Sequence, residues 1–207
     1  MTVPSDTRPR GARLPRATRR RQLLAAAQEV FVAQGYHAAA MDDIAERAGV
    51  SKPVLYQHFP GKLDLYVALL EQHSEALVAN QRAALQSTED NRERVAASFR
   101  AYFDFVAGEG EAFRIVFESD LRNLPQVREK MEQTLIECAE LTSEVIRTDT
   151  GLTEEEAHLL GIGLVGMAET AARYWINSTG SIPKEAAEQL IARLAWRGIS
   201  GWELTRG

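Results

Sequence analysis

Apolar residues recur at intervals of three and four along most of the 207-residue chain, and no segment alternates apolar and polar residues as a half-buried strand does. Two short helices are predicted within residues 44–63. The other predicted helices cover residues 17–34, 62–86, 89–107, 111–118, 126–147, 153–177 and 181–204. The predicted fold class is therefore all-α, with about nine helices.

The two short helices within residues 44–63 are joined by a tight turn. In the second helix, Leu55, Phe59 and Leu63 repeat every four residues, as one buried helical face requires. Gly49 stands where the first helix is expected to end, a position that favours a positive φ. This arrangement is typical of a helix-turn-helix motif.

The second helix of this motif has a polar outward face. Ser51 is expected to cap it, and Pro53 is tolerated in its first turn, where amides have no intrahelical partner. A cation, a phenol, an amide and an imidazole on one face favour a nucleic-acid groove, because each can donate hydrogen bonds to phosphates or base edges. A merely solvated amphipathic helix is the alternative. The side chains left outward are Lys52, Val54, Tyr56, Gln57 and His58.

Basic residues concentrate in the N-terminal third of a chain whose formal net charge is −5. Residues 1–62 hold ten Lys and Arg against five Asp and Glu, a net +5, whereas the remainder holds fourteen against twenty-four, a net −10. A polyanion would therefore be attracted to the part of the chain that contains the helix-turn-helix motif.

Residues 1–15 carry three prolines and scattered arginines with few apolar side chains, which predicts a disordered basic arm. Together with Arg16 and the arginines at residues 19–21, the arm either contacts phosphates or a minor groove, or only increases solubility.

The side-chain inventory predicts neither a metal nor a cofactor. The single cysteine, Cys138, excludes an intramolecular disulfide and a Cys-rich zinc site, and the four histidines are not spaced as metal ligands. No apolar run follows the N-terminal arginines as in a secretory signal, and the longest apolar run, residues 159–168, is too short to cross a bilayer. We therefore expect a cytoplasmic protein.

Residues 23–77 resemble the TetR family of bacterial transcriptional regulators. The resemblance rests on Gly35-Tyr36 at the end of the first helix and on the string DIAERAGVSKPVLYQHFPGKLDLY at residues 43–66.

This resemblance implies a helix-turn-helix DNA-binding domain over residues 16–62 and a helical effector-binding and dimerisation domain over residues 63–207. It further implies a homodimer that binds a near-palindromic double-stranded DNA operator, usually as a repressor, and no membrane partner.

Carried over by position, the resemblance assigns seven residues to DNA. Lys62 has an additional reason, because it begins a helix whose N-terminal amides attract phosphate. The family often has Thr before its second helix, whereas residues 39–41 are Ala-Ala-Met here, and Asp42 is expected to cap instead. Pro53 stands where the family usually has a small residue, which affects how closely the helix approaches the groove. Lys52, Pro53, Val54 and Gln57 are expected at base edges, and Tyr56, His58 and Lys62 at phosphates.

Residues 54–70 and 101–120 are also similar to an actinobacterial subgroup that includes a fatty-acid-synthesis regulator responsive to long-chain acyl-CoA. This similarity implies a small apolar effector, either an acyl chain or its CoA thioester, and activation as well as repression. Aromatic and sulfur side chains are expected to line the effector cavity of the second domain. The alternative is that these side chains only pack in an ordinary helical core. Those side chains are Phe99, Phe103, Phe113, Phe117, Met131, Leu135, Cys138 and Met167.

Small residues make the predicted helix 153–177 smooth enough for another helix to approach closely. In the family, the last two helices of each subunit form a four-helix dimer interface, although burial within one subunit explains some of the large side chains equally well. The small residues are Gly161, Gly163, Gly166, Ala168, Ala171 and Ala172, and the large ones are Trp175, Leu190, Leu194, Trp196 and Trp202.

Two other functional classes compete with the regulator. An enzyme would have to use Cys138, His158, Glu169 or Asp120, but no nucleophile motif surrounds any of them. A helical ligand-binding or protein-interaction module without DNA binding is the closer alternative.

Overall fold

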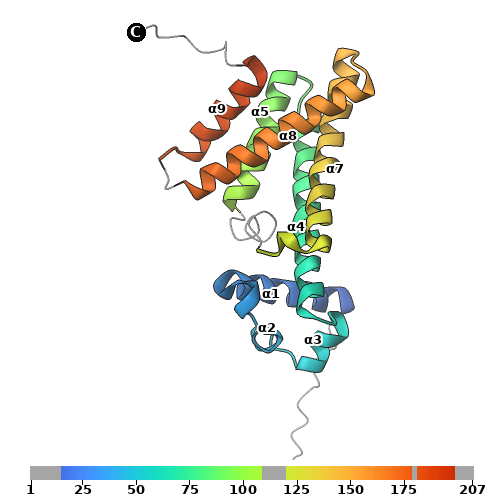
Figure 1. Cartoon of the computed structure of the whole chain (residues 1–207), viewed down its shortest axis with the longest axis vertical. Helices are drawn as coiled ribbons and strands as arrows, with labels where there is room; N and C mark the ends of the chain where they lie inside the picture. The colour runs from blue at the N-terminus through green and yellow to red at the C-terminus, as the bar shows by residue number, and fades with distance from the viewer. Residues whose placement is uncertain (1–14, 109–119, 179–180, 199–207) are drawn as a thin grey trace, which may run out of the picture. The chain divides into compact units, whose positions relative to one another are not determined.

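The computed structural model describes residues 15–108, 120–178 and 181–198, and all regular structure within these ranges is helical (Figure 1). Eight α-helices and one 3-10 helix confirm the predicted all-α fold class. The chain divides into two compact units, Met1–Leu65 and Tyr66–Gly207.

Some predictions fall on residues that the structure does not describe. These are the basic arm up to residue 14, the helix over residues 111–118, and residues 199–204 of the last helix. Among the described residues, none of the helices has both the length and the apolarity that crossing a membrane requires.

The first unit is a three-helix assembly closed by the start of a fourth helix. Its helices are α1 (Arg16–Ala38), α2 (Met41–Arg47), α3 (Lys52–His58) and the beginning of α4 (Lys62–Gln86). Gly35 interrupts α1 with a φ of 76°, and Gly49 turns the chain from α2 into α3 with a φ of 64°, as predicted for that glycine. The fully buried large side chains of this unit are Leu23, Ile44, Leu55, Phe59 and Leu65.

The side-chain caps predicted for α2 and α3 are both wrong. Asp42 lies inside α2, where its Oδ2 accepts a hydrogen bond of 2.5 Å from Nζ of Lys52. Ser51 does stand at the start of α3, but its hydroxyl accepts no capping bond. Pro53 explains this result, because it removes the second amide of the helix. The third amide, that of Val54, donates to the carbonyl oxygen of Ser51 at 3.0 Å.

The second unit is a layered helical bundle. Its elements after α4 are α5 (Asn91–Gly108), η1 (Asp120–Asn123), α7 (Pro125–Thr150), α8 (Glu154–Asn177) and α9 (Lys184–Arg197). The capping box predicted at the start of α8 is confirmed: Thr153 donates its amide to Glu156 Oε2 at 2.9 Å, and Glu156 donates its amide to Thr153 Oγ1 at 3.3 Å. α9 begins after Pro183, rather than at Ser181.

α7 and α8 form an antiparallel pair that turns at Gly151, and α5 packs against both α8 and α9 (Figure 1). The two helices of the pair approach closely at Gly161. A Cβ atom there would lie 2.2 Å from Ser143 Oγ and 2.6 Å from the carbonyl oxygen of Ala139. Glycine is therefore required for this helix contact.

Candidate nucleic-acid interface and effector pocket

α3 presents most of the residues predicted to contact DNA. The side chain of Tyr56 is 47% exposed, and Lys52, Pro53 and Gln57 are exposed beside it. The hydrogen bond and the charge of Asp42 raise the pKa of Lys52, so this cation is exposed but already paired. The amide of Gln57 and the phenol of Tyr56 are therefore the hydrogen-bonding groups on this face that are not committed to an ion pair.

His58 and Val54 are only half-buried, and His58 lies close to charges of α1. Burial lowers the pKa of His58, and the positive charges of Arg16, Arg20 and Arg19 lower it further. The imidazole is therefore neutral at pH 7 and can donate only one hydrogen bond to a phosphate.

The arginines at residues 16 and 19–21 belong to α1, which begins at Arg16, one residue before the predicted start of the first helix. The guanidinium of Arg20 lies 4.4 Å from the ring centroid of Phe59. Arg20, with Arg16 and Arg19, lies near the C-terminal end of α3, and these cations add positive charge to the predicted DNA-binding unit.

Lys62 lies where sequence comparison places a phosphate contact, but its ammonium group is turned into the unit. Nζ donates to the carbonyl oxygens of Tyr36, His37 and Ala39 at 2.7, 3.2 and 2.8 Å. It also lies 4.6 Å from the ring centroid of Tyr36. An ammonium has three donors, and all three are used here to hold the carbonyl groups that the break at Gly35 leaves without helical partners.

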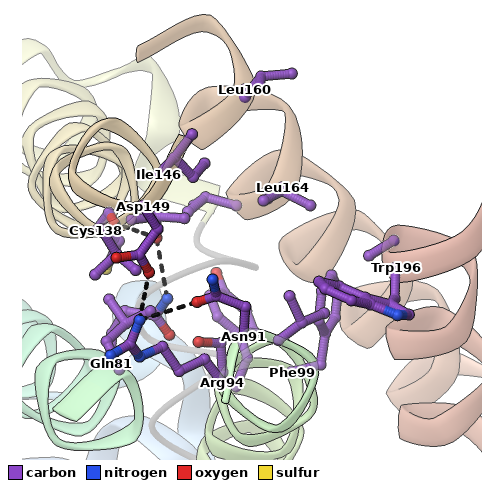
Figure 2. A pocket seen from close by; sticks show the side chains of 18 of the residues that line it. Gln81, Asn91, Arg94, Phe99, Cys138, Ile146, Asp149, Leu160, Leu164 and Trp196 are labelled. Atoms are coloured by element: carbon purple, nitrogen blue, oxygen red, sulfur yellow. Dashed lines mark hydrogen bonds and ion pairs between the residues drawn. The ribbon is translucent and has the colours of Figure 1, made fainter. Parts of the chain in front are cut away.

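The second unit contains a cavity of about 420 Å³ between α4, α5, α7, α8 and α9, which we call the apolar pocket (Figure 2). Its walls are mostly aliphatic and aromatic, as expected for a small-molecule site. The lining residues labelled in Figure 2 are Gln81, Asn91, Arg94, Phe99, Cys138, Ile146, Asp149, Leu160, Leu164 and Trp196.

Several polar groups of the apolar pocket are paired with one another. Arg94 Nη1 lies 2.6 Å from Asp149 Oδ2 and donates to Asn91 Oδ1 at 2.9 Å. Gln81 Nε2 donates to Thr142 Oγ1 at 3.2 Å. Most of the remaining lining is aliphatic or aromatic, which suits an apolar ligand.

Of the eight residues predicted to line a ligand cavity, Phe99 and Cys138 line the apolar pocket. Phe103 instead packs against Trp175, with ring centroids 5.6 Å apart. Met131, Leu135 and Met167 are not among the lining residues, and Phe113 and Phe117 lie outside the described residues. The ligand assignment for this set stays a prediction.

Sequence reasoning missed the polar lining of the pocket. Gln81 and Thr142 are buried. The sequence marks these two positions only as polar residues among the apolar residues of one helix face. Arg94 and Asp149 are separated by 55 residues, so nothing in the local pattern indicates their pairing.

Cys138 is buried and is a free cysteine. Burial, followed by the charge of Glu137, raises the pKa of its thiol from 9.0 to about 12. The folded state thus favours the neutral thiol; this preference contributes stability below pH 9 that is lost as the pH rises towards 12.

We therefore expect iodoacetamide to leave Cys138 unmodified in the native protein at pH 8 and to alkylate it in denaturant, because the thiolate is the reactive species. Mass spectrometry of the single cysteine measures both rates. Equal rates in the native and the unfolded protein would contradict the burial of this thiol.

α8 and α9 carry exposed apolar side chains. Leu159 is 72% exposed and Tyr174 is 73% exposed, and several large apolar side chains exposed on neighbouring helices are typical of a protein interface. The other exposed large apolar residues of these helices are Leu160, Ile162, Leu190 and Trp196. In the part of the chain that the structure describes, no group of three or more His, Cys, Asp or Glu side chains is placed to hold a metal ion.

Comparison with known proteins agrees with this architecture. The family model described as "Bacterial regulatory proteins, tetR family" matches residues 23–69. The HTH-type transcriptional activator FasR of Mycolicibacterium smegmatis is 46% identical over 203 residues, which cover 98% of this chain and 93% of the relative.

Two solved structures share the fold. A TetR-like transcriptional regulator from Rhodococcus sp. RHA1 has 29% identity and a TM-score of 0.69, covering 92% of this chain and 100% of its own. The regulator FadR from Bacillus subtilis, solved in complex with stearoyl-CoA, has 21% identity and a TM-score of 0.71, covering 86% of this chain and 98% of its own. The chain therefore belongs to the TetR family of bacterial regulatory proteins and is a DNA-binding transcriptional regulator.

Proposed function

We propose that this regulator is a homodimer that reads a near-palindromic operator with α3 and responds to a long-chain acyl-CoA bound in the apolar pocket. The main support is the cavity of about 420 Å³ within the second unit, which is lined mostly by aliphatic and aromatic side chains. A site of this size and lining suits a ligand that contributes methylene groups rather than hydrogen bonds.

The choice of an acyl-CoA is supported by what is known of similar proteins. The FadR structure from Bacillus subtilis contains stearoyl-CoA, and a second neighbour is a fatty acid degradation regulator from Bacillus halodurans. Each buried methylene contributes about 0.8 kcal/mol, so affinity should rise by roughly fourfold per added carbon until the pocket is filled.

The homodimer is supported by the exposed apolar face of α8 and α9. Leu159, Ile162 and Tyr174 of α8 and Leu190 of α9 are all more than a third exposed, which is costly unless another protein surface covers them. A second copy of the chain presents the same face, so the contact is self-complementary.

The direction of control follows from which conformation the ligand prefers. The resemblance favours repression, whereas FasR is named an activator. Effector and operator affinities change each other by the same factor, so the ligand has an effect only if it binds the DNA-bound and DNA-free conformations differently.

The proposal is tested by selecting genomic fragments with the purified protein at near-physiological salt, and titrating the enriched DNA with acyl-CoA of increasing chain length. Enrichment of one near-palindrome and a chain-length-dependent change in its affinity support the proposal. Weak, salt-sensitive binding to all fragments would contradict the operator, and equal responses at every chain length would contradict the acyl effector.

On the enriched operator, we expect two neighbouring substitutions in α3 to act differently. Tyr56→Phe removes a hydroxyl predicted to contact phosphate, and should weaken binding about three- to tenfold for every sequence. Gln57→Ala should instead relax preference at one base position, by about 1–3 kcal/mol. Binding to a panel of single-base operator variants measures both effects. Gln34→Ala in α1 is the matched control, and a Gln57→Ala profile identical to wild type would remove Gln57 from the base contacts.

A further inference from the structure

The side-chain amide of Gln81, on the wall of the apolar pocket, is oriented by its neighbour Thr142 (Figure 2). Thr142 Oγ1 donates its proton to the carbonyl oxygen of Cys138 at 3.0 Å, so towards Gln81 it can only accept. The nitrogen Nε2 of Gln81 therefore faces Thr142, at 3.2 Å, and the oxygen Oε1 is directed elsewhere. These two hydrogen bonds determine which atoms of the amide are left for a ligand.

Gln81 Oε1 is an acceptor without a donor. Gln81 is only 6% exposed, and within the described part of the chain no group donates to its amide oxygen. This oxygen is nevertheless not fully enclosed, so it keeps a surface open to the pocket that Gln81 lines. Nε2 also retains a second N–H, because Thr142 takes only one of its two protons. A buried acceptor without a donor is unfavourable, and a ligand that brings a donor removes this cost.

The Gln81 amide lies inside the apolar pocket and not at its rim. Gln81 and Thr142 are buried, whereas Asn91 and Thr150, which line the same pocket, are exposed. Thr142 lies about two turns of α7 before Thr150, which is about 12 Å along the helix. The charged nucleotide end of an acyl-CoA stays at the exposed rim, because burying phosphates without partners is costly. The part of the ligand that reaches Gln81 is therefore the acyl chain.

We propose that Gln81 makes the apolar pocket selective for an acyl chain that carries a hydroxyl group. This inference rests on the proposed function, because it defines the chemistry of the same ligand. A hydroxyl donates to Gln81 Oε1 and accepts from the second N–H of Nε2, whereas a keto group can only accept. An unmodified chain leaves Oε1 without a donor. The remainder of the chain stays apolar, because most of the lining is aliphatic or aromatic.

The test is isothermal titration calorimetry of the full chain with stearoyl-CoA, 3-hydroxystearoyl-CoA, 10-hydroxystearoyl-CoA and 12-hydroxystearoyl-CoA, each below its aggregation concentration. The oxo counterpart of the tightest hydroxylated thioester is then measured. We expect wild type to bind that hydroxylated thioester about three- to tenfold more tightly than stearoyl-CoA, with the oxo thioester between the two.

The pocket variant is Gln81→Met with Thr142→Val, which removes the amide and its partner together, so that neither is left unpaired. Its preference should reverse in favour of stearoyl-CoA, since the hydroxyl would then be buried without a partner. The control, Gln133→Met, makes the same change at an exposed position of α7 and should keep the wild-type preference. Ligands are compared within each protein, so a general loss of affinity does not affect the comparison.

Three outcomes would overturn the inference while leaving the acyl effector in place. These are equal affinity of wild type for the unmodified and all hydroxylated thioesters, an oxo thioester that binds as tightly as its hydroxylated counterpart, and a wild-type preference that persists in the pocket variant. The ranking in wild type decides the inference even if the pocket variant binds no ligand. Failure of wild type to bind any of the thioesters would instead overturn the acyl effector itself, and the inference with it.

Discussion

Replacing Lys62 with methionine should lower operator affinity to a similar extent for all sequences without changing the salt dependence of binding. Two of the three carbonyl oxygens that Nζ contacts, those of Tyr36 and Ala39, are in part-buried hydrogen bonds, and losing the donor costs about 1 kcal/mol for each of them. The connection between α1 and α2 would loosen, and α3 would be less well positioned for the groove. Thermal unfolding of the variant should accordingly begin at lower temperature.

The slope of log K against log salt separates this positioning role from a phosphate contact. Loss of one phosphate contact lowers the magnitude of that slope by about 0.9, because fewer counterions are released on binding. Lys52→Met, which removes the same charge from the exposed face of α3, is the charge-matched control for the slope. A Lys62→Met protein of normal stability with a reduced slope would show that Lys62 does contact phosphate, as the family resemblance implies.

Gly161→Ala should destabilise the protein by about 2–3 kcal/mol. The new Cβ would overlap with Ser143 Oγ, which donates to the carbonyl oxygen of Ala139 at 2.6 Å. The serine side chain can rotate, but the carbonyl of Ala139 belongs to the α7 backbone. α8 must therefore move away from α7, and the packing between the two helices loosens.

Gly163→Ala is the matched control, since a Cβ there has no atom within 4 Å in this chain. A helical glycine changed to alanine in open space should gain about 0.5–1 kcal/mol. Urea denaturation followed by circular dichroism measures both changes, with sedimentation as a check that the dimer persists. Equal stabilities for the two variants would contradict the close contact at Gly161.

Local sequence patterns predicted the parts of the structure that depend on neighbouring residues. Gly49 has the positive φ that its place after a helix indicated, and the Thr153–Glu156 capping box forms as its spacing indicated. The same local reasoning was wrong about Asp42, which is the second residue of α2 and pairs with Lys52, ten residues away.

The candidate sites were less predictable because they depend on which helix faces pack against each other. Phe99 and Phe103 have the same chemistry and lie four residues apart on α5, yet one lines the apolar pocket and the other packs against Trp175. The position of Lys62 could be aligned with the family, but the direction of its ammonium is set by the carbonyl groups exposed after Gly35. Pairing of Arg94 with Asp149 requires α5 and α7 to be adjacent, which no local pattern indicates.

The buried pair of Gln81 and Thr142 constrains how this pocket can evolve. Thr142 Oγ1 donates its one proton to the carbonyl oxygen of Cys138 at 3.0 Å, so towards Gln81 it can only accept. Changing either residue alone to an apolar one leaves a buried polar group without its partner, whereas changing both together does not. The two positions, 61 residues apart, are therefore expected to change together during evolution. A lineage that enlarges the pocket by changing one of them first would pass through a protein of lower stability.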